Sequence, residues 1–143
     1  REKGYIVKDC YVYFGENKPI GMSVHKKKLY SEFLEKHNLD YRQFNSKGWE
    51  PDDCYISFKN KTAYIIEKKF QKSPGSVDEK LATCHFKLLE YQKLFSALAY
   101  KTTYIFVLSD WFKRPEYRDV LAYINLMGCF YFFNEIPLDF LGL

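Results

Sequence analysis

The sequence predicts an α/β domain in which helices flank a mixed β-sheet. A β-hairpin pattern over residues 54–70 is followed by a long amphipathic pattern over 77–100 and by the uninterrupted apolar run 102–108. Hairpin strands are antiparallel, whereas a long helix between two strands usually returns the chain parallel to the first, so both strand directions are expected in one sheet. The length of 143 residues suits a single domain, here predicted to span 1–143.

The N-terminal part of the chain predicts one strand and one helix. Residues 5–14 are rich in aromatic and β-branched residues, with an interruption at Lys8-Asp9, and they predict a strand. Residues 26–37 predict an amphipathic helix, because apolar side chains recur at helical spacing: Leu29, Tyr30, Phe33 and Leu34. The polar segment 38–47 predicts a loop.

The central part predicts a hairpin and a long helix. Residues 54–58 and 62–70 bracket a polar turn that contains Asn60, a residue that tolerates positive φ. After a loop, Ser76 and Glu79 have the spacing of a capping box. Apolar residues then step by three and four, which predicts the helix over 77–100.

The C-terminal part predicts two strands around a second helix. Residues 102–108 form an apolar run typical of a strand covered on both faces. An apolar stripe from Tyr117 to Met127, closed by Gly128, predicts a helix. Residues 129–133 predict the last strand, and an apolar tail begins at Pro137.

Composition restricts the class of protein. A hydrophobic content of 47% and an aromatic content of 20% exclude a disordered chain. The net charge of +4 permits nucleic-acid binding without demanding it. No apolar run reaches the about 18 residues of a membrane helix, and the N-terminus has no signal-peptide core. The four cysteines lack zinc-site spacing, so we expect a soluble cytoplasmic protein with free thiols. The chain begins at Arg1 without an initiator Met, which leaves open whether residues precede it.

The segment 49–71 contains the candidate chemistry. Asp52 stands at the entry of the first hairpin strand, and Glu67 and Lys69 lie near the end of the second. Metal-assisted phosphodiester hydrolysis needs oxygen ligands for a hard cation and a positive side chain beside the attacking water. Asp52 and Glu67 are therefore candidate metal ligands, and Lys69 is the candidate to orient or deprotonate the water.

The turn length decides which aspartate joins this set. With a two-residue turn at Asn60-Lys61, Asp52 lies opposite Lys69, and Glu67 shares their face because side chains alternate along a strand. A three-residue loop would shift the register by one residue and bring Asp53 into the set instead. Because Asn60-Lys61 suits a two-residue turn, we favour Asp52.

Charged hairpins often carry only exposed cross-strand ion pairs, so a purely structural interpretation is also open. Against it, Ile65-Ile66 makes the second strand apolar up to Glu67, and a buried charge needs a role. Gln71 continues the face of Glu67 as a possible accessory residue. Lys68 points to the other face, where it would reach solvent or a phosphate.

These residues resemble a known signature. Pro51-Asp52, fourteen intervening residues and then Glu67-Lys68-Lys69 are similar to the motif of the PD-(D/E)xK nuclease superfamily. The run over residues 65–95 (IIEKKFQKSPGSVDEKLATCHFKLLEYQKLF) resembles small type II restriction endonuclease-like proteins, and the similarity extends from about Leu29 to the C-terminus.

The resemblance implies a restriction endonuclease-like core and magnesium-dependent cleavage of DNA that leaves a 5′-phosphate, with Mn²⁺ able to substitute. By position it implies that Asp52 and Glu67 bind the metal and that Lys69 positions or activates the water. An accessory acid often comes from the preceding helix, where Glu35 is the first candidate. The family core usually has a further strand before the Asp-bearing strand; residues 38–47 show none, and residues 5–14 are a possible substitute.

Further DNA contacts are expected around the loop after the hairpin. It leads into a helix N-terminus, whose free N–H groups can receive a phosphate. The candidate DNA-binding residues are Lys68, Lys72, Ser73 and Ser76.

The leading hypothesis is a magnesium-dependent endonuclease of double-stranded DNA, most like a type II restriction enzyme. Cutting two strands with one site per chain predicts a homodimer. Two alternatives stay open: a structure-specific nuclease of repair or junction resolution, and a catalytically inactive DNA-binding module on a nuclease-like scaffold. The sequence does not specify a recognition site or a cleavage pattern.

Overall fold

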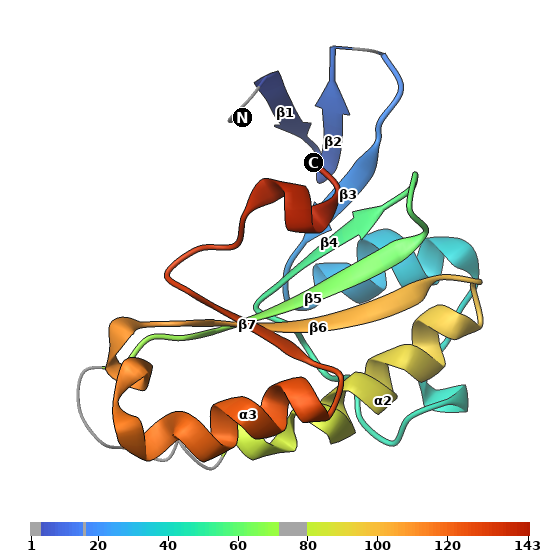
Figure 1. Cartoon of the computed structure of the whole chain (residues 1–143). Coiled ribbons are helices and arrows are strands. Elements are labelled where there is room, and N and C mark those ends of the chain that lie inside the picture. The colour runs from blue at the N-terminus through green and yellow to red at the C-terminus, as the bar shows by residue number, and fades with distance from the viewer. Residues whose placement is uncertain (1–3, 16, 72–79) are drawn as a thin grey trace.

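The computed structural model describes residues 4–15, 17–71 and 80–143, and its strands form one seven-stranded mixed sheet (Figure 1). The strands follow one another across the sheet in chain order. Neighbours are antiparallel from the first strand to the fifth and parallel from the fifth to the seventh. The strands are β1 (Tyr5–Lys8), β2 (Tyr11–Phe14), β3 (Gly21–Val24), β4 (Asp53–Ser57), β5 (Thr62–Lys69), β6 (Lys101–Leu108) and β7 (Phe130–Phe133). The predicted α/β class with a mixed sheet is confirmed.

Two helices connect the parallel strands. α2 (Cys84–Ser96) lies between β5 and β6, and α3 (Arg118–Leu126) lies between β6 and β7. A crossover helix is the usual connection for parallel neighbours. The shorter helical elements are the π-helix η2 (Leu29–Leu34) and the 3₁₀ turns η3 (Glu35–His37), η4 (Tyr41–Gln43), η5 (Leu81–Thr83), η6 (Asp110–Lys113), η7 (Pro115–Tyr117) and η8 (Leu138–Leu141).

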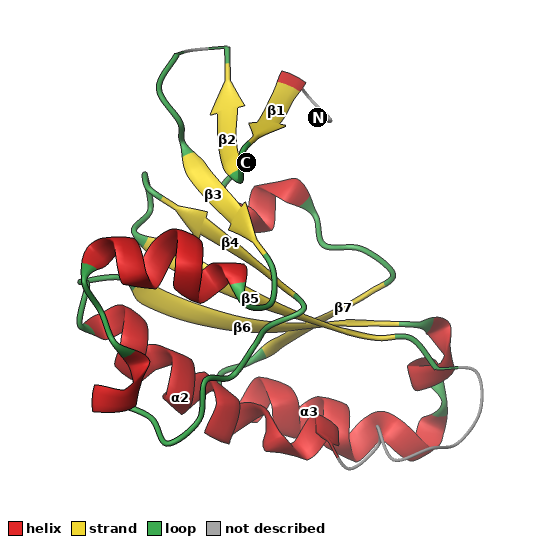
Figure 2. Ribbon diagram, turned by 180° about the vertical axis from the view of Figure 1, so that it is seen from behind, coloured by secondary structure: helices red, strands yellow, loops and turns green. Residues whose placement is uncertain are grey.

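The two faces of the sheet are covered differently (Figures 1 and 2). η2, α2 and α3 pack on one face around the larger core, and η8 packs on the other face around a smaller one. Along β5, Ala63 and Ile65 belong to the helical side, while Tyr64 and Ile66 belong to the η8 side. Both sides of β5 are therefore buried, and its alternation directs Glu67 into the helix-covered side.

The N-terminal region differs from the prediction of one strand over residues 5–14. It is a hairpin of β1 and β2, turned at Asp9 and Cys10, whose φ values are 51° and 73°. Positive φ at both central residues is the mark of the two-residue turns that match strand twist. The β3 strand was not predicted at all. It places Gly21 so close to β4 that an added Cβ would lie 2.5 Å from the carbonyl oxygen of Ile56.

The helices are shorter than predicted. The expected helix over 26–37 is a π-helical turn and a 3₁₀ turn within residues 29–37, ended by Asn38 with a φ of 60°. α2 begins at Cys84 and ends at Ser96, and Ala99 follows with a φ of 63°. The predicted capping box of Ser76 and Glu79 lies outside the described residues.

Residues 38–47 contain only the short η4 turn and no strand, as the sequence predicts. β3, rather than a strand in this segment, pairs with the free edge of β4. All four cysteines are free thiols. Across the described ranges, the helices are too short or too polar for any of them to cross a bilayer.

Candidate functional site

The β4–β5 hairpin brings Asp52 beside Glu67. Ser57 pairs with Thr62 and Asp53 with Ile66, so residues 58–61 form the connection. The predicted two-residue turn, with Asp52 opposite Lys69, is therefore wrong, and so is the three-residue alternative. The true register differs from the predicted one by two residues, and a shift by two keeps every side chain on its face. Asp52, one residue before β4, lies across from Glu67.

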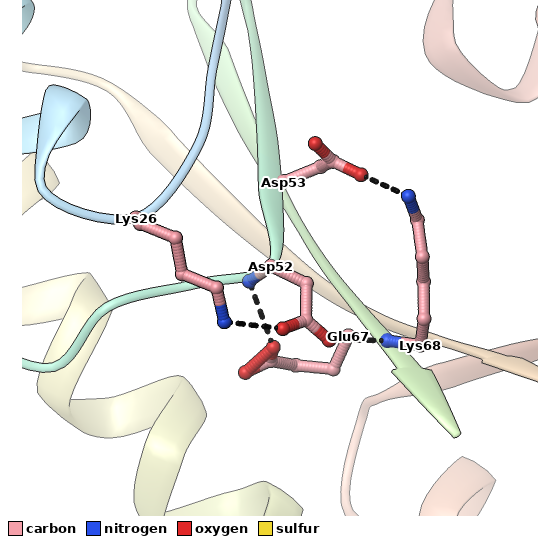
Figure 3. A network of polar contacts seen from close by, with 5 residues as sticks. All are labelled: Lys26, Asp52, Asp53, Glu67 and Lys68. Atoms are coloured by element: carbon pink, nitrogen blue, oxygen red, sulfur yellow. Dashed lines mark hydrogen bonds and ion pairs between the residues drawn. The ribbon is translucent and has the colours of Figure 1, made fainter. Parts of the chain in front are cut away.

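Direct hydrogen bonds connect the two acids (Figure 3). The backbone N–H of Asp52 donates to Oε2 of Glu67 at 3.0 Å, and the backbone N–H of Lys68 donates to Oδ2 of Asp52 at 2.8 Å. Lys26 Nζ completes the network at 2.6 Å from Oδ1 of Asp52. Each carboxylate is thus held by the backbone of the opposite strand, which fixes the pair without a flexible linker.

Lys26 reaches Asp52 because the loop after β3 is held against the hairpin entry. Its backbone N–H donates to the carbonyl of Pro51 at 2.8 Å, and its φ is 52°. The Lys26 side chain is 53% exposed and that of Asp52 is 27% exposed. A half-exposed positive side chain therefore pairs with one oxygen of the Asp52 carboxylate.

Asp53 belongs to the other face of the sheet. Its carboxylate forms an ion pair with Lys68 Nζ at 2.7 Å, and both side chains are partly exposed. Figure 3 shows the Asp53–Lys68 pair on the opposite side of the strands from Glu67. Lys68 therefore points away from the acid pair, as the alternation of β5 predicts, and Asp53 is not part of it.

The two acids differ in how readily they ionise. Burial raises the pKa of Glu67, and the nearby charge of Asp52 raises it further. The hydrogen bond from the Asp52 N–H and the charges of Lys69 and Lys87 lower it, but by less. Burial also opposes ionisation of Asp52, but the hydrogen bonds from Lys26 and from the Lys68 backbone outweigh it and hold its pKa below the usual range. Carboxylates with pKa values moved apart in this way are typical of functional sites.

Two lysines lie close to the pair on the helix-covered side. Lys69 follows Glu67 by two residues on β5, and its charge lowers the pKa of both acids, yet it forms no ion pair with either. Lys87 comes from α2; burial lowers its pKa, while the charge of Glu67 raises it. The sequence predicted Lys69 as a site residue but did not single out Lys87. Its position one helical turn from the buried Cys84 and Tyr91 was the available signal.

The remaining predicted residues are not brought to the pair. Glu35 is exposed on η3 and lines a separate hollow with Asn38 and Arg42, and no described hydrogen bond or ion pair joins it to Asp52 or Glu67. The backbone N–H of Gln71 donates to Oγ of Ser109 at 3.0 Å, and the Ser109 hydroxyl donates to the Gln71 carbonyl at 2.9 Å. The predicted DNA-binding residues of the following loop lie outside the described residues: Lys72, Ser73 and Ser76.

The donor set suits one kind of metal ion. Within ranges 4–15, 17–71 and 80–143, no three His, Cys, Asp or Glu residues gather as a metal site. Asp52 and Glu67 offer two carboxylates. Zinc and calcium sites usually need more protein ligands, whereas Mg²⁺ keeps several waters and often uses only one or two carboxylates. Two carboxylates therefore suit Mg²⁺ better than they suit zinc or calcium.

The chain matches no protein-family model, no curated protein and no solved structure. The site geometry therefore has to support any functional proposal.

Proposed function

We propose that the chain is a magnesium-dependent DNA endonuclease with a PD-(D/E)xK site, most like a type II restriction enzyme. The observation that supports this most is the hydrogen bond from the Asp52 N–H to Glu67, which makes neighbours of two acids fifteen residues apart in sequence. Lys69 lies on the same face. The hairpin followed by the β5–α2–β6 crossover is the arrangement expected of a restriction endonuclease-like core.

In this proposal Asp52 and Glu67 hold the metal ion. When bound, magnesium would offset the negative charge that develops on the scissile phosphate. Lys69 donates a hydrogen bond to the attacking water and holds it against the phosphate. Lys26 leaves Asp52, because its exposed ammonium is released to solvent or to a DNA phosphate at little cost.

The difference in pKa between the acids gives the site a pH dependence. Asp52 stays ionised well into the acidic range, whereas Glu67 takes up a proton at higher pH than an ordinary glutamate. A protonated Glu67 is a poor ligand for a hard cation. Magnesium binding and cleavage should therefore weaken, as pH falls, through the raised pKa of Glu67.

Double-stranded DNA is the proposed substrate, and a homodimer is the proposed assembly, with one site for each strand. Discrete cleavage of a plasmid would favour the restriction-enzyme proposal. Cleavage confined to branched DNA would favour a repair or junction-resolving nuclease, and binding without cleavage an inactive module.

The test is incubation of supercoiled plasmid with the purified chain and Mg²⁺, followed by mapping of the ends. We expect nicked and linear products with 5′-phosphates. The matched variant Glu67→Gln keeps the size of the side chain and should lose more than about 100-fold in rate, since even outer partners of metal ligands are worth about 10–100-fold. An uncut plasmid with folded protein, in both Mg²⁺ and Mn²⁺, would contradict the proposal.

A further inference from the structure

An aromatic and basic cluster adjoins the acid pair. The Trp49 platform comprises Trp49, Phe86, Lys47 and Lys87. The rings of Trp49 and Phe86 meet edge to face, with centroids 5.9 Å apart and planes at 87°. Lys87 Nζ lies 4.3 Å and Lys47 Nζ 5.2 Å from the Trp49 ring centroid. Phe86 is 53% exposed although it is a large apolar residue.

The Trp49 ring is held in place from behind. Its indole N–H donates to Oε1 of the buried Glu90 at 3.0 Å, and Lys93 pairs with Oε2 of the same carboxylate at 2.8 Å. The Asn45 amide donates to the Glu90 carbonyl at 2.9 Å. The ring is therefore ordered before any ligand arrives, so that a ligand which stacks on it loses little affinity to ordering the protein.

Lys87 joins the platform to the candidate site. It stands over the Trp49 ring and is close enough to Glu67 for each charge to act on the other. Trp49 itself precedes Asp52 by three residues. The platform and the acid pair are therefore linked by Lys87 on α2 and by the short segment that leads from Trp49 to Asp52 at the entry of β4.

The two lysines of the platform form no ion pair with a described carboxylate, because Glu90 pairs with Lys93 and Glu67 acts on Lys87 only through its charge. Lys69 and Lys80 add positive charge around Lys87. A ligand that suits this surface therefore carries a flat ring and a negative group close together. Nucleotides combine both, and stacking on aromatic rings is how proteins bind unpaired bases without reading their sequence.

We propose that the Trp49 platform binds an unpaired nucleotide of single-stranded DNA beside the acid pair, with the base stacked on the exposed ring of Phe86, its edge against Trp49, and the phosphate bound by Lys47 and Lys87. The inference rests on the proposed nuclease function and adds to it a contact with a single-stranded region of the DNA next to the cut. Cation–π contacts at exposed rings are weak beside base stacking, so the lysines can move from the ring to the phosphate.

The first test measures binding without cleavage. Fluorescence anisotropy of labelled dT20 in EDTA compares the unsubstituted chain with Phe86→Ala and with the control Phe14→Ala, a phenylalanine of similar exposure (50%) on β2. We expect Phe86→Ala to weaken dT20 binding about tenfold, the loss of one stacked base, and blunt duplex binding less than twofold. Phe14→Ala should match the unsubstituted chain. Equal affinities for dT20 in all proteins would overturn the proposal.

A second measurement reports on Trp49 in a folded chain. With Trp111→Phe as background, Trp49 is the only tryptophan, and dT20 should quench its fluorescence. Binding of dT20 without quenching would overturn the proposal. Absence of any dT20 binding would also overturn the proposal and would favour a protein partner for this surface.

The two proposals fail separately. A tenfold loss of dT20 binding in Phe86→Ala, together with an uncut plasmid in Mg²⁺, would refute the nuclease and support the platform. Magnesium-dependent cleavage with no effect of Phe86→Ala on dT20 binding would support the nuclease and refute the platform.

Discussion

Glu67→Gln should make the protein more stable while it removes metal binding. Glutamine keeps the size of the side chain and an oxygen that accepts the Asp52 N–H, but it has no charge to desolvate. Because burial raises the pKa of Glu67, its ionised form destabilises the fold at high pH, by about 1.4 kcal/mol for each unit of the shift. In a chain of this length each kcal/mol moves Tm by about 2–5 °C, so the variant is expected to have the higher Tm at pH 8.

The pH dependence has a definite sign. The folded protein holds a proton on Glu67 at pH values where the unfolded chain has lost it, so the free energy of unfolding falls as pH rises through that window. Below the ordinary glutamate pKa of about 4.3, the variant and the unsubstituted chain should be equally stable. The lowered pKa of Asp52 has the opposite effect, with stability lost as pH falls, but both proteins share it and it cancels in the difference.

Thermal unfolding from pH 4 to pH 8, with and without Mg²⁺, measures both effects. The Tm difference should open toward pH 8. Mg²⁺ should raise the Tm of the unsubstituted chain, because binding at 100 times its Kd adds about 2.7 kcal/mol to the free energy of unfolding. The Tm of Glu67→Gln should not change with Mg²⁺. A variant that is less stable at pH 8, or that gains as much from Mg²⁺, would refute the reasoning.

Four further substitutions test the site and its scaffold. Asp52→Asn should abolish plasmid cleavage, whereas the cleavage rate of Asp53→Asn should stay within about twofold of the unsubstituted chain. The Asp53 ion pair is partly exposed, and such pairs are worth about 0–1 kcal/mol. Loss of cleavage in Asp53→Asn alone would contradict the assignment. Lys26→Met should tighten Mn²⁺ binding in calorimetry, since its ammonium lies 2.6 Å from Oδ1 of Asp52, a proposed metal ligand, and weaker binding would count against this. Gly21→Ala should lower the urea midpoint by the equivalent of about 1–3 kcal/mol, because its Cβ would lie 2.5 Å from a β4 carbonyl oxygen; an unchanged midpoint would show that β3 adjusts freely.

The sequence predicted the centre of the sheet well because its signals there are long. The apolar run of β6 and the extended stripe of α2 leave one simple arrangement, a parallel crossover from β5. β3 has no such signal: its four residues GMSV include a glycine and one β-branched residue. It is a strand because Gly21 permits close contact with β4, which is a tertiary effect.

Asp52 was predicted to lie beside Glu67, and it does, although the predicted turn was wrong. The sequence did not reveal that the connection has four residues, with the positive φ at Lys61 rather than at Asn60. Only the parity of the register decides which face an aspartate joins, so an error of two residues left Asp52 with Glu67. An error of one would have chosen Asp53.

The neighbours of the pair could not be predicted from local patterns. Lys26 contacts Asp52 because its loop adopts a positive φ and binds the Pro51 carbonyl. Lys87 approaches Glu67 because α2 packs on that face of the sheet. Both contacts join segments at least twenty residues apart, and neither the residue types nor their spacing predicts them.

The most direct test of the central claim, that Asp52 and Glu67 together hold the metal, is a calorimetric titration of Mn²⁺ at pH 8. The unsubstituted chain is compared with the double variant Asp52→Asn/Glu67→Gln, which keeps the shape of both side chains. We predict saturable binding by the unsubstituted chain and none by the variant. Equal heats from the two proteins would contradict the account.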